Sequence, residues 1–536
     1  MLLTAALLAA SIAAAADVAP PVMTQRERAL HALNRLGYGP RPGDVEKVED
    51  MGPDKWVEIQ LHPENIPDDA VEARLKSLPS LAMGGEELMN AYPNMKRRRL
   101  LGIFGKENPP KDVGQDLAAA KILRAVMSER QLQEVLTDFW FNHFNVSAAK
   151  NQDRWLIVPY ERDVIRPHLF GKFRDLLGAV AHSPAMLIYL DNYQSTIDSR
   201  YAPAGAQEDI AEMESAMSKN AKGRQKLGLN ENYARELLEL HTLGVDGGYT
   251  QKDVTELARI LTGWTVTRPN KKNADKVKDW QFVFRRRMHD PGAKVLLGEP
   301  YAWAGEAEGE KALDRLARHP ATARFIALKL CRRFVSDDPP ADLVDRVAKR
   351  FRETDGDLRE TYKALFSDPE FWQRRFFRAK VKTPLEFTAG ILRATGAEIR
   401  DPEKVARNVD ALGMPLYRCE PPTGWPDRAE PWVSAGALVS RLRAAQNLFN
   451  KRPDSPASAS PDAAVAGADR GDGRALVLHL TDAYLGGVTA PRTLDALFRR
   501  LDDPEISRAR LDDKRRDYRL DRLAALILGA PDFQRR

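Results

Sequence analysis

Cysteine is almost absent from this chain. The 536 residues include only two cysteines, Cys331 and Cys419. No Cys-x-x-Cys pair exists, which excludes zinc ribbons and dithiol redox centres. In an oxidising compartment the two thiols could form one disulfide, and two buried free thiols are the alternative. The sequence leaves both states open.

Long hydrophobic runs are missing beyond the N-terminus. No later run approaches the roughly 20 apolar residues that cross a bilayer, so we expect no transmembrane segment in the mature chain. Residues 1–16 form a small, apolar run that ends in three alanines, although no Lys or Arg precedes it. This pattern is typical of a signal peptide, with a helical N-terminal tail as the alternative. We expect export, to the periplasm or the extracellular medium.

Signatures of nucleic-acid binding are also missing. Lys and Arg number 82 against 76 Asp and Glu, which gives a net charge of +6. Acidic and basic residues alternate along most of the chain, as on solvated helix faces. The basic runs 96–99 and 285–287 could meet a polyanion. No zinc finger, RNP-like strand or basic zipper helix accompanies them, so we expect no nucleic-acid partner.

Strand patterns are scarce and helix patterns dominate. Residues 279–284 and 294–298 are the clearest strand candidates, and we predict that they pair as a hairpin. Capping boxes beginning at Thr24, Ser128 and Thr250 predict three helix starts. The sequence therefore predicts a mainly α, multi-helical globular fold with at most a small β-hairpin.

The chain divides by composition into four parts. After the predicted signal peptide, helical patterning extends over residues 24–450. Residues 452–473 are rich in Pro, Ala, Ser and Asp, which is typical of a low-complexity loop or linker. Residues 474–536 are again helical in pattern, and we expect this C-terminal segment to pack on the main domain.

Standard catalytic motifs are missing too. The sequence has no G-x-S-x-G elbow, Walker A loop, G-x-G-x-x-G or H-E-x-x-H. Candidate chemistry must therefore come from polar residues grouped on helices. The segment 230–250, NENYARELLELHTLGVDGGYT, places Asn232, Glu236 and Glu239 on one helix face, because their spacings are four and three. His241 points toward the apolar side of that helix.

A second segment, 138–145, combines dense aromatics with polar residues. Asp138, Asn142 and Asn145 form one stripe at spacings of four and three, and His143 lies beside it. The aromatics predict a buried helix, so these polar groups need partners.

Two short segments and one rigid loop complete the candidates. His289-Asp290 follows a predicted strand, and a His-Asp pair can bind a metal or orient a proton transfer. Asp191-Asn192 ends a predicted helix. Trp425, in the proline-rich loop PPTGWPD, could be a recognition platform or could simply pack on the core.

If these segments converge, three interpretations remain open. They could form a divalent-metal site, an acid/base pair, or a buried polar network that fixes helix packing. For catalysis, Glu236 or Glu239 is the candidate base and His143 or His289 the candidate acid. The candidates for binding substrate are Asp138, Asn142, Asp191, Asn232 and Trp425. The candidates for binding a metal are His143, Glu236, His241, His289 and Asp290.

Several long motifs occur in a familiar order. HALNRLGYGPRPGDVEKV, DFWFNHFNV, LNENYARELLELHTLGVDGGYTQKDVTELARILTGWT, HDPGAKVLLG and PPTGWPD together resemble the bacterial DUF1800 family, over roughly residues 25–450. The resemblance implies an exported, largely helical protein, and it implies an exported DUF1501 protein as a possible partner. It implies no activity and no catalytic residue. Residues 452–473 do not resemble the family pattern.

Two functional hypotheses follow. The first is an enzyme with a polar, metal-assisted or acid/base site that acts on an extracytoplasmic substrate. The second is a non-catalytic envelope scaffold or assembly factor that binds a protein or polymer. An open site where the polar segments meet favours the first, and dispersed or fully satisfied polar groups favour the second.

Overall fold

The computed structural model describes most of the chain. The described residues are 22–93, 98, 113–150, 152–197, 205, 207–208, 211, 227–269, 273–449, 453–509 and 516–536. The predicted signal peptide lies outside them, as does most of the basic run 96–99. No helix within these ranges is long and apolar enough to cross a membrane.

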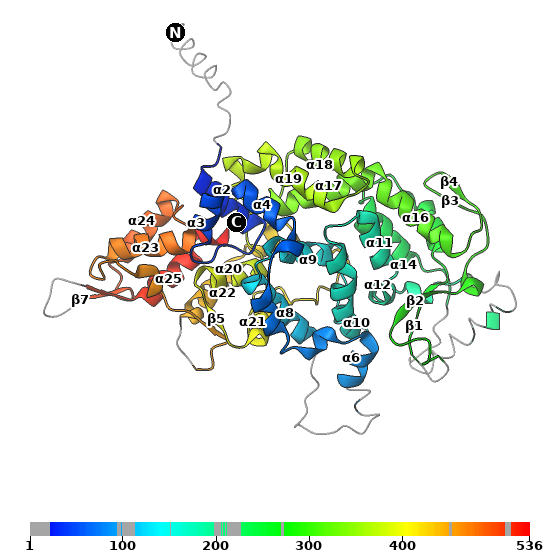
Figure 1. Cartoon of the computed structure of the whole chain (residues 1–536), viewed down its shortest axis with the longest axis horizontal. Helices are drawn as coiled ribbons and strands as arrows, with labels where there is room; N and C mark the ends of the chain where they lie inside the picture. Colours follow the sequence, from blue (N-terminus) through cyan, green and yellow to red (C-terminus); the bar gives the residue numbers. More distant parts are fainter. Residues whose placement is uncertain are drawn as a thin grey trace, which may run out of the picture.

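Helices make up most of the structure, as predicted (Figure 1). The first half contains α2 (Gln25–Arg35), α3 (Asp44–Met51), α4 (Pro53–Gln60), α5 (Asp69–Leu75), α6 (Gly85–Ala91), α8 (Val113–Met127), α9 (Gln131–His143), α10 (Asp153–Pro159), α11 (Phe173–Ala181), α12 (Pro184–Tyr189), α14 (Glu231–Glu236) and α15 (Gln251–Ile260). The second half contains α16 (Glu306–Arg318), α17 (Pro320–Phe334), α18 (Ala341–Glu353), α19 (Leu358–Ser367), α20 (Pro384–Ala394), α21 (Pro402–Ala411), α22 (Ala435–Leu448), α23 (Gly473–Leu485), α24 (Pro491–Arg500), α25 (Leu520–Gly529) and α26 (Pro531–Gln534).

The β structure consists of short antiparallel pairs among the described residues. Their strands are β1 (Trp264–Thr267) with β2 (Gln281–Phe284), β3 (Lys294–Leu296) with β4 (Glu299–Tyr301), β5 (Glu398–Ile399) with β6 (Ala457–Ser458), and β7 (Ser507–Ala509) with β8 (Arg516–Tyr518).

The predicted pairing of residues 279–284 with 294–298 is wrong. Each segment forms a strand but pairs elsewhere, 281–284 with β1 and 294–296 with β4. Leu297 and Gly298 separate β3 from β4, and both have positive φ, 49° and 79°. This backbone matches the tight two-residue turn that favours hairpins, so β3 closes on the strand that follows it.

Two of the three predicted capping boxes are confirmed. The hydroxyls of Thr24 and Thr250 accept hydrogen bonds from the backbone N–H groups of Glu27 and Asp253. The carboxylates of Glu27 and Asp253 in turn accept from the backbone N–H groups of Thr24 and Thr250. The prediction at Ser128 is wrong. Its hydroxyl donates to Asp68 (2.7 Å), and α9 begins at Gln131 without a side-chain cap. A partner distant in sequence has replaced the local cap.

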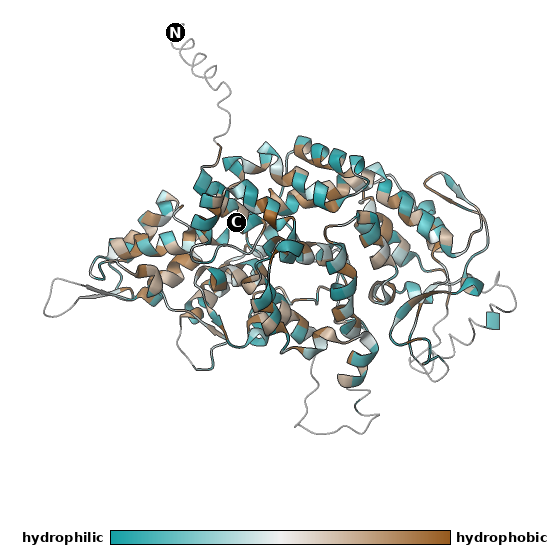
Figure 2. Cartoon of the chain, viewed as in Figure 1, coloured by the Kyte–Doolittle hydropathy of each residue, from teal (hydrophilic) through white to brown (hydrophobic). Residues whose placement is uncertain are grey.

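One contiguous hydrophobic core runs through the molecule, from Ala29 in α2 to Phe533 in α26. Figure 2 shows helices that carry hydrophobic residues on one side and hydrophilic residues on the other. In Figure 1 the helices α23–α25 lie at one end of the long axis and β1–β4 at the other. The described part of 452–473 is tied to the body, since β6 pairs with β5 and Val465 is buried. The helices α9, α12 and α14 lie between these ends.

Candidate functional site

Asn142 near the end of α9 and Asn145 just beyond it hold the proline-rich loop. Asn142 donates to the carbonyl of Trp425 (2.8 Å) and accepts from the Trp425 amide (2.7 Å). Asn145 donates to the carbonyls of Cys419 (2.9 Å) and Pro421 (2.8 Å). These bonds satisfy backbone groups of the loop that would otherwise lie unpaired against the helix. The asparagines therefore position the loop, and the Trp425 ring stays half-buried beside Trp432, at 6.1 Å between ring centroids.

His143 of segment 138–145 and His241 of segment 230–250 meet in the core. The Nε2–H of His143 donates to the carbonyl of His241 (3.2 Å), and the two rings lie 6.3 Å apart among Trp140, Phe144 and Phe325. Burial lowers the pKa of His241 to about 3 and holds the pKa of His143 well below its usual range. Both imidazoles are therefore neutral at physiological pH.

A π-helical turn follows α14 and carries the second carboxylate of the pair. Residues Leu237–Thr242 adopt this turn, and the Thr242 hydroxyl donates to the Leu237 carbonyl (2.6 Å). Such turns are rare and occur often at functional sites. The insertion leaves Glu236 at the end of α14 and Glu239 within the turn, both half-buried.

The two carboxylates have different surroundings. Glu239 accepts a hydrogen bond from the Tyr249 hydroxyl (2.7 Å). Glu236 makes no side-chain hydrogen bond with any residue that the structure describes. Burial raises the pKa of Glu236, and the neighbouring charge of Glu239 raises it further. One carboxyl is thus biased toward its protonated form next to another that is anchored by a hydrogen bond.

Tyr189, at the end of α12, binds the proline-rich loop. Its hydroxyl donates to the Glu420 carbonyl (2.6 Å). Burial raises the pKa of this hydroxyl. Cys419, in the same loop, has its thiol pKa raised to about 11 by burial, so it is a thiol rather than a thiolate at neutral pH.

A buried acid and a half-buried ion pair lie at the same end of α12 as Tyr189. Lys150 binds the Asp191 carboxylate (2.9 Å), and the backbone of Asp191 is held in the left-handed region at φ 60°. Asp153 is fully buried, and neither of its carboxyl oxygens has a hydrogen-bond partner among the described residues. Burial raises the pKa of Asp153 well above its usual range, so this carboxyl is held neutral.

His289 and Asp290 belong to a different network. His289 contacts the carbonyl of Thr262 (2.9 Å) and the carboxylate of Glu308 (3.3 Å), which also binds Lys294 (2.7 Å). Asp290 is paired with Arg259 (2.7 Å). Although burial opposes it, the Arg259 hydrogen bond lowers the pKa of Asp290. These contacts tie β3 to α15 and α16.

Three of the four predicted segments therefore meet, together with the proline-rich loop. They are 138–145, 191–192 and 232–241, joined by the His143–His241 bond and by Asn232, which donates to the Leu190 carbonyl (3.4 Å). Asp138 instead pairs with Lys121 (2.8 Å), and Asn192 donates to the Trp264 carbonyl (3.0 Å). Within the described ranges, no group of three or more His, Cys, Asp or Glu side chains could hold a metal ion.

Sequence reasoning missed two groups near Asp191. They are Lys150 and Asp153, which no local pattern marked. Only the fold brings them close to Asp191. Both cysteines are free and buried, which decides between the two states left open above.

Fold and site together define a mainly helical globular protein with two half-buried carboxyls at the turn after α14 and a tryptophan-bearing loop bound to Asn142 and Asn145. A family model described as "Protein of unknown function (DUF1800)" matches residues 31–535. The chain therefore belongs to the DUF1800 family. The match extends past residue 450 through the Pro- and Ala-rich segment and the C-terminal helices. No curated protein and no solved structure matches the chain.

Proposed function

We propose that this chain is an exported enzyme in which Glu236 and Glu239 act as an acid/base pair on an extracytoplasmic molecule. The observation that carries the proposal is the state of Glu236. Its carboxyl is half-buried, has no hydrogen-bond partner among the described residues, and has a raised pKa next to a second carboxylate. When the environments of two neighbouring carboxyls push their pKa values apart, the carboxyl with the raised pKa usually acts as the acid and the other as the base.

The surrounding residues fit defined roles in such a reaction. Glu236, biased toward protonation, donates a proton to a leaving group. Glu239, held by Tyr249, accepts a proton from water or substrate. The Trp425 ring, fixed through its backbone by Asn142, offers an apolar surface to a sugar or peptide group. The reaction class is hydrolysis or elimination, since each requires one proton donor and one acceptor.

Export is supported by residues 1–16, whose apolar run and alanine end are typical of a cleaved leader. An exported DUF1501 protein is a partner that the family resemblance implies. One experiment tests both the export and the partner. The chain is purified from the periplasm, its N-terminus is sequenced, and co-purifying proteins are identified. A mature chain that begins at Asp17 supports export, and a full-length cytoplasmic chain contradicts it.

We expect Glu236→Gln to abolish turnover while leaving the fold intact. Purified protein is incubated with fractionated envelope and extracellular polymers, and new products are detected by mass spectrometry. Loss of a general acid costs about 10²–10⁴-fold in rate. Gln cannot ionise, so it also removes the cost of holding a charge in this position. We therefore expect the melting temperature of the variant to be no lower than that of the wild type.

The matched control is Glu72→Gln, an exposed glutamate in α5. It should yield the same products as the wild type. Products formed equally by Glu236→Gln would contradict the catalytic role. Absence of products from the wild-type protein across the whole panel, with a partner retained on purification, would favour the scaffold hypothesis instead.

A further inference from the structure

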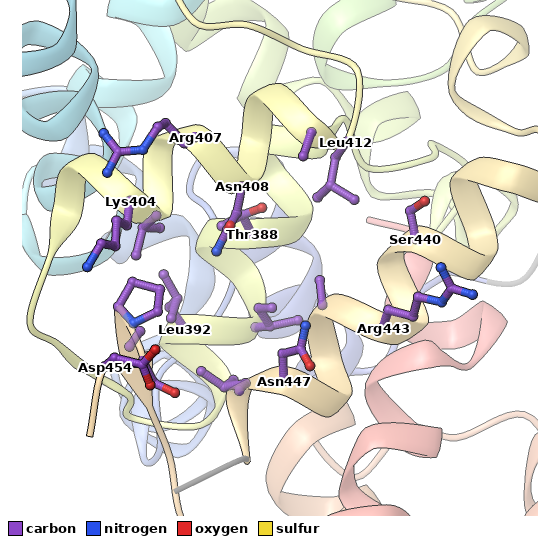
Figure 3. Close-up of a pocket in the computed structure, with 18 residues that line it drawn as sticks. Thr388, Leu392, Lys404, Arg407, Asn408, Leu412, Ser440, Arg443, Asn447 and Asp454 are labelled. Carbon is purple, nitrogen blue, oxygen red and sulfur yellow. The ribbon is translucent and has the colours of Figure 1, made fainter. Parts of the chain in front are cut away.

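A cavity of about 510 Å³ lies between α20, α21, α22 and the segment 454–457 (Figure 3). Its volume falls in the range of small-molecule sites, about 300–1,000 Å³. The residues that line it all follow residue 387, so it shares none with the carboxylate pair. The cavity is therefore a separate feature of the molecule.

The interior of the cavity is apolar. Ile391 and Leu392 from α20, Val405 from α21 and Leu448 from α22 line it, and all four are buried in the core. Side chains that face empty volume lack contacts on that side. An apolar group that enters would gain about 25 cal/mol for each Å² of apolar surface removed from water.

The rim carries excess positive charge. Lys404 and Arg407 stand on α21 and Arg443 on α22, at opposite sides in Figure 3, and Asp454 is the acidic residue among the lining residues. Lys404 is paired with Asp401 (3.3 Å) and Arg407 approaches Glu403 (4.0 Å). Arg443 is exposed and makes no ion pair or hydrogen bond with any described residue.

We infer that this cavity binds a single-chain amphiphile with an anionic head. The acyl chain lies against Ile391, Leu392 and Leu448, and the carboxylate or phosphate head binds Arg443 at the rim. The guanidinium supplies a planar, fixed set of donors that suits either head group. A neutral amphiphile would fill the same interior but leave Arg443 without a partner. This inference goes beyond the proposed catalytic function and does not depend on it.

The test measures binding by titration calorimetry below the micellar concentration of each probe. The probes are tetradecanoate, tetradecanoyl glycerol phosphate and, as the neutral comparison of matched chain length, tetradecyl maltoside. We expect at least one of the two anions to bind the full mature protein and tetradecyl maltoside to bind at least about tenfold more weakly, the effect of one charge-assisted contact. Which anion binds more tightly identifies the head group.

Three variants locate the binding. Arg443→Glu should weaken anion binding by at least about tenfold, because it replaces attraction by repulsion at the rim. Ala444→Trp, which fills the cavity, should abolish it. Arg499→Glu, an exposed change of the same charge on α24, should leave it unchanged. Thermal unfolding checks that each variant folds. If Ala444→Trp does not fold, Arg443→Glu still tests the inference, because it alters an exposed side chain.

Equal affinity for tetradecyl maltoside and tetradecanoate would overturn the inference. So would binding that Arg443→Glu leaves unchanged, or the absence of binding by both anions.

Discussion

Glu386→Gln is expected to lower the free energy of unfolding by about 3–5 kcal/mol, the cost of breaking a buried ion pair. Glu386, in the first turn of α20, is 4% exposed. Its Oε1 binds the guanidinium of Arg333 and lies 3.1 Å from Nε of Arg536. Gln keeps the shape of the side chain but removes its charge, so both buried guanidinium groups lose their counter-charge.

The measurement is urea unfolding followed by circular dichroism at neutral pH. The matched control is Glu398→Gln, whose carboxylate pairs with Arg400 (2.9 Å) at the surface. Exposed pairs contribute roughly 0–1 kcal/mol, so this control should change stability little. A loss of equal size in the two variants would show that the buried network is not what stabilises this region.

The same carboxylate gives the wild type a pH dependence with a definite sign. Although burial opposes it, the charges of Arg333 and Arg536 hold the pKa of Glu386 well below its usual range. A carboxyl with a depressed pKa in the folded state contributes stability above its unfolded pKa of about 4.3 and loses it as the pH falls further. Glu386→Gln should therefore show a smaller loss of stability than the wild type between neutral pH and about pH 3.

Gly424→Ala is expected to release the proline-rich loop from α9 and to cost about 2–4 kcal/mol. Gly424 has φ of +72°, a backbone conformation that L side chains rarely adopt. A Cβ atom there would also overlap the backbone and side-chain oxygens of Asn142. The loop would have to move, and both hydrogen bonds between Asn142 and Trp425 would be lost.

The variant Gly413→Ala separates the effect of the positive φ from the effect of the overlap with Asn142. Gly413 also has a positive φ, +97°, but a Cβ atom there would meet no atom within 4 Å. It carries the backbone strain without the overlap. We expect Gly424→Ala to be the less stable variant by urea unfolding and to be cleaved faster by protease between α21 and α22. Equal stability and equal cleavage would mean that the contact with Asn142 does not hold the loop.

Local periodicity predicted the polar stripe of 138–145 only in part. Asn142 and Asn145 bind the same loop, but α9 ends at His143, so Asn145 lies beyond the helix. Asp138 pairs with Lys121 instead. Their partners could not be predicted. The Asn142–Trp425 bond joins residues 283 positions apart, and nothing in either segment alone encodes that separation. His241 was expected on the apolar side of its helix and His143 beside the polar stripe, and both are buried.

Other features escaped prediction for identifiable reasons. The π-helical turn at 237–242 breaks the 3.6-residue period on which the face assignment rested, so Glu239 does not continue the α14 spiral. The β3–β4 hairpin uses Leu297-Gly298, a turn without the usual Asn-Gly or Asp-Gly signal. Ser128 caps no helix because Asp68 takes its hydroxyl. His289 and Asp290 contact Glu308 and Arg259 rather than the carboxylate pair.

The central claim is that Glu236 keeps its proton to a higher pH than an ordinary glutamate, because it is half-buried and Glu239 is close by. The most direct test is an NMR titration of protein labelled with ¹³C at the glutamate carboxyl carbons, with Glu236→Gln used to assign the signal. We predict a midpoint above the ordinary value of about 4.3 that falls in Glu239→Gln, where the neighbouring charge is gone. A midpoint at or below about 4.3, unchanged in Glu239→Gln, would contradict the account.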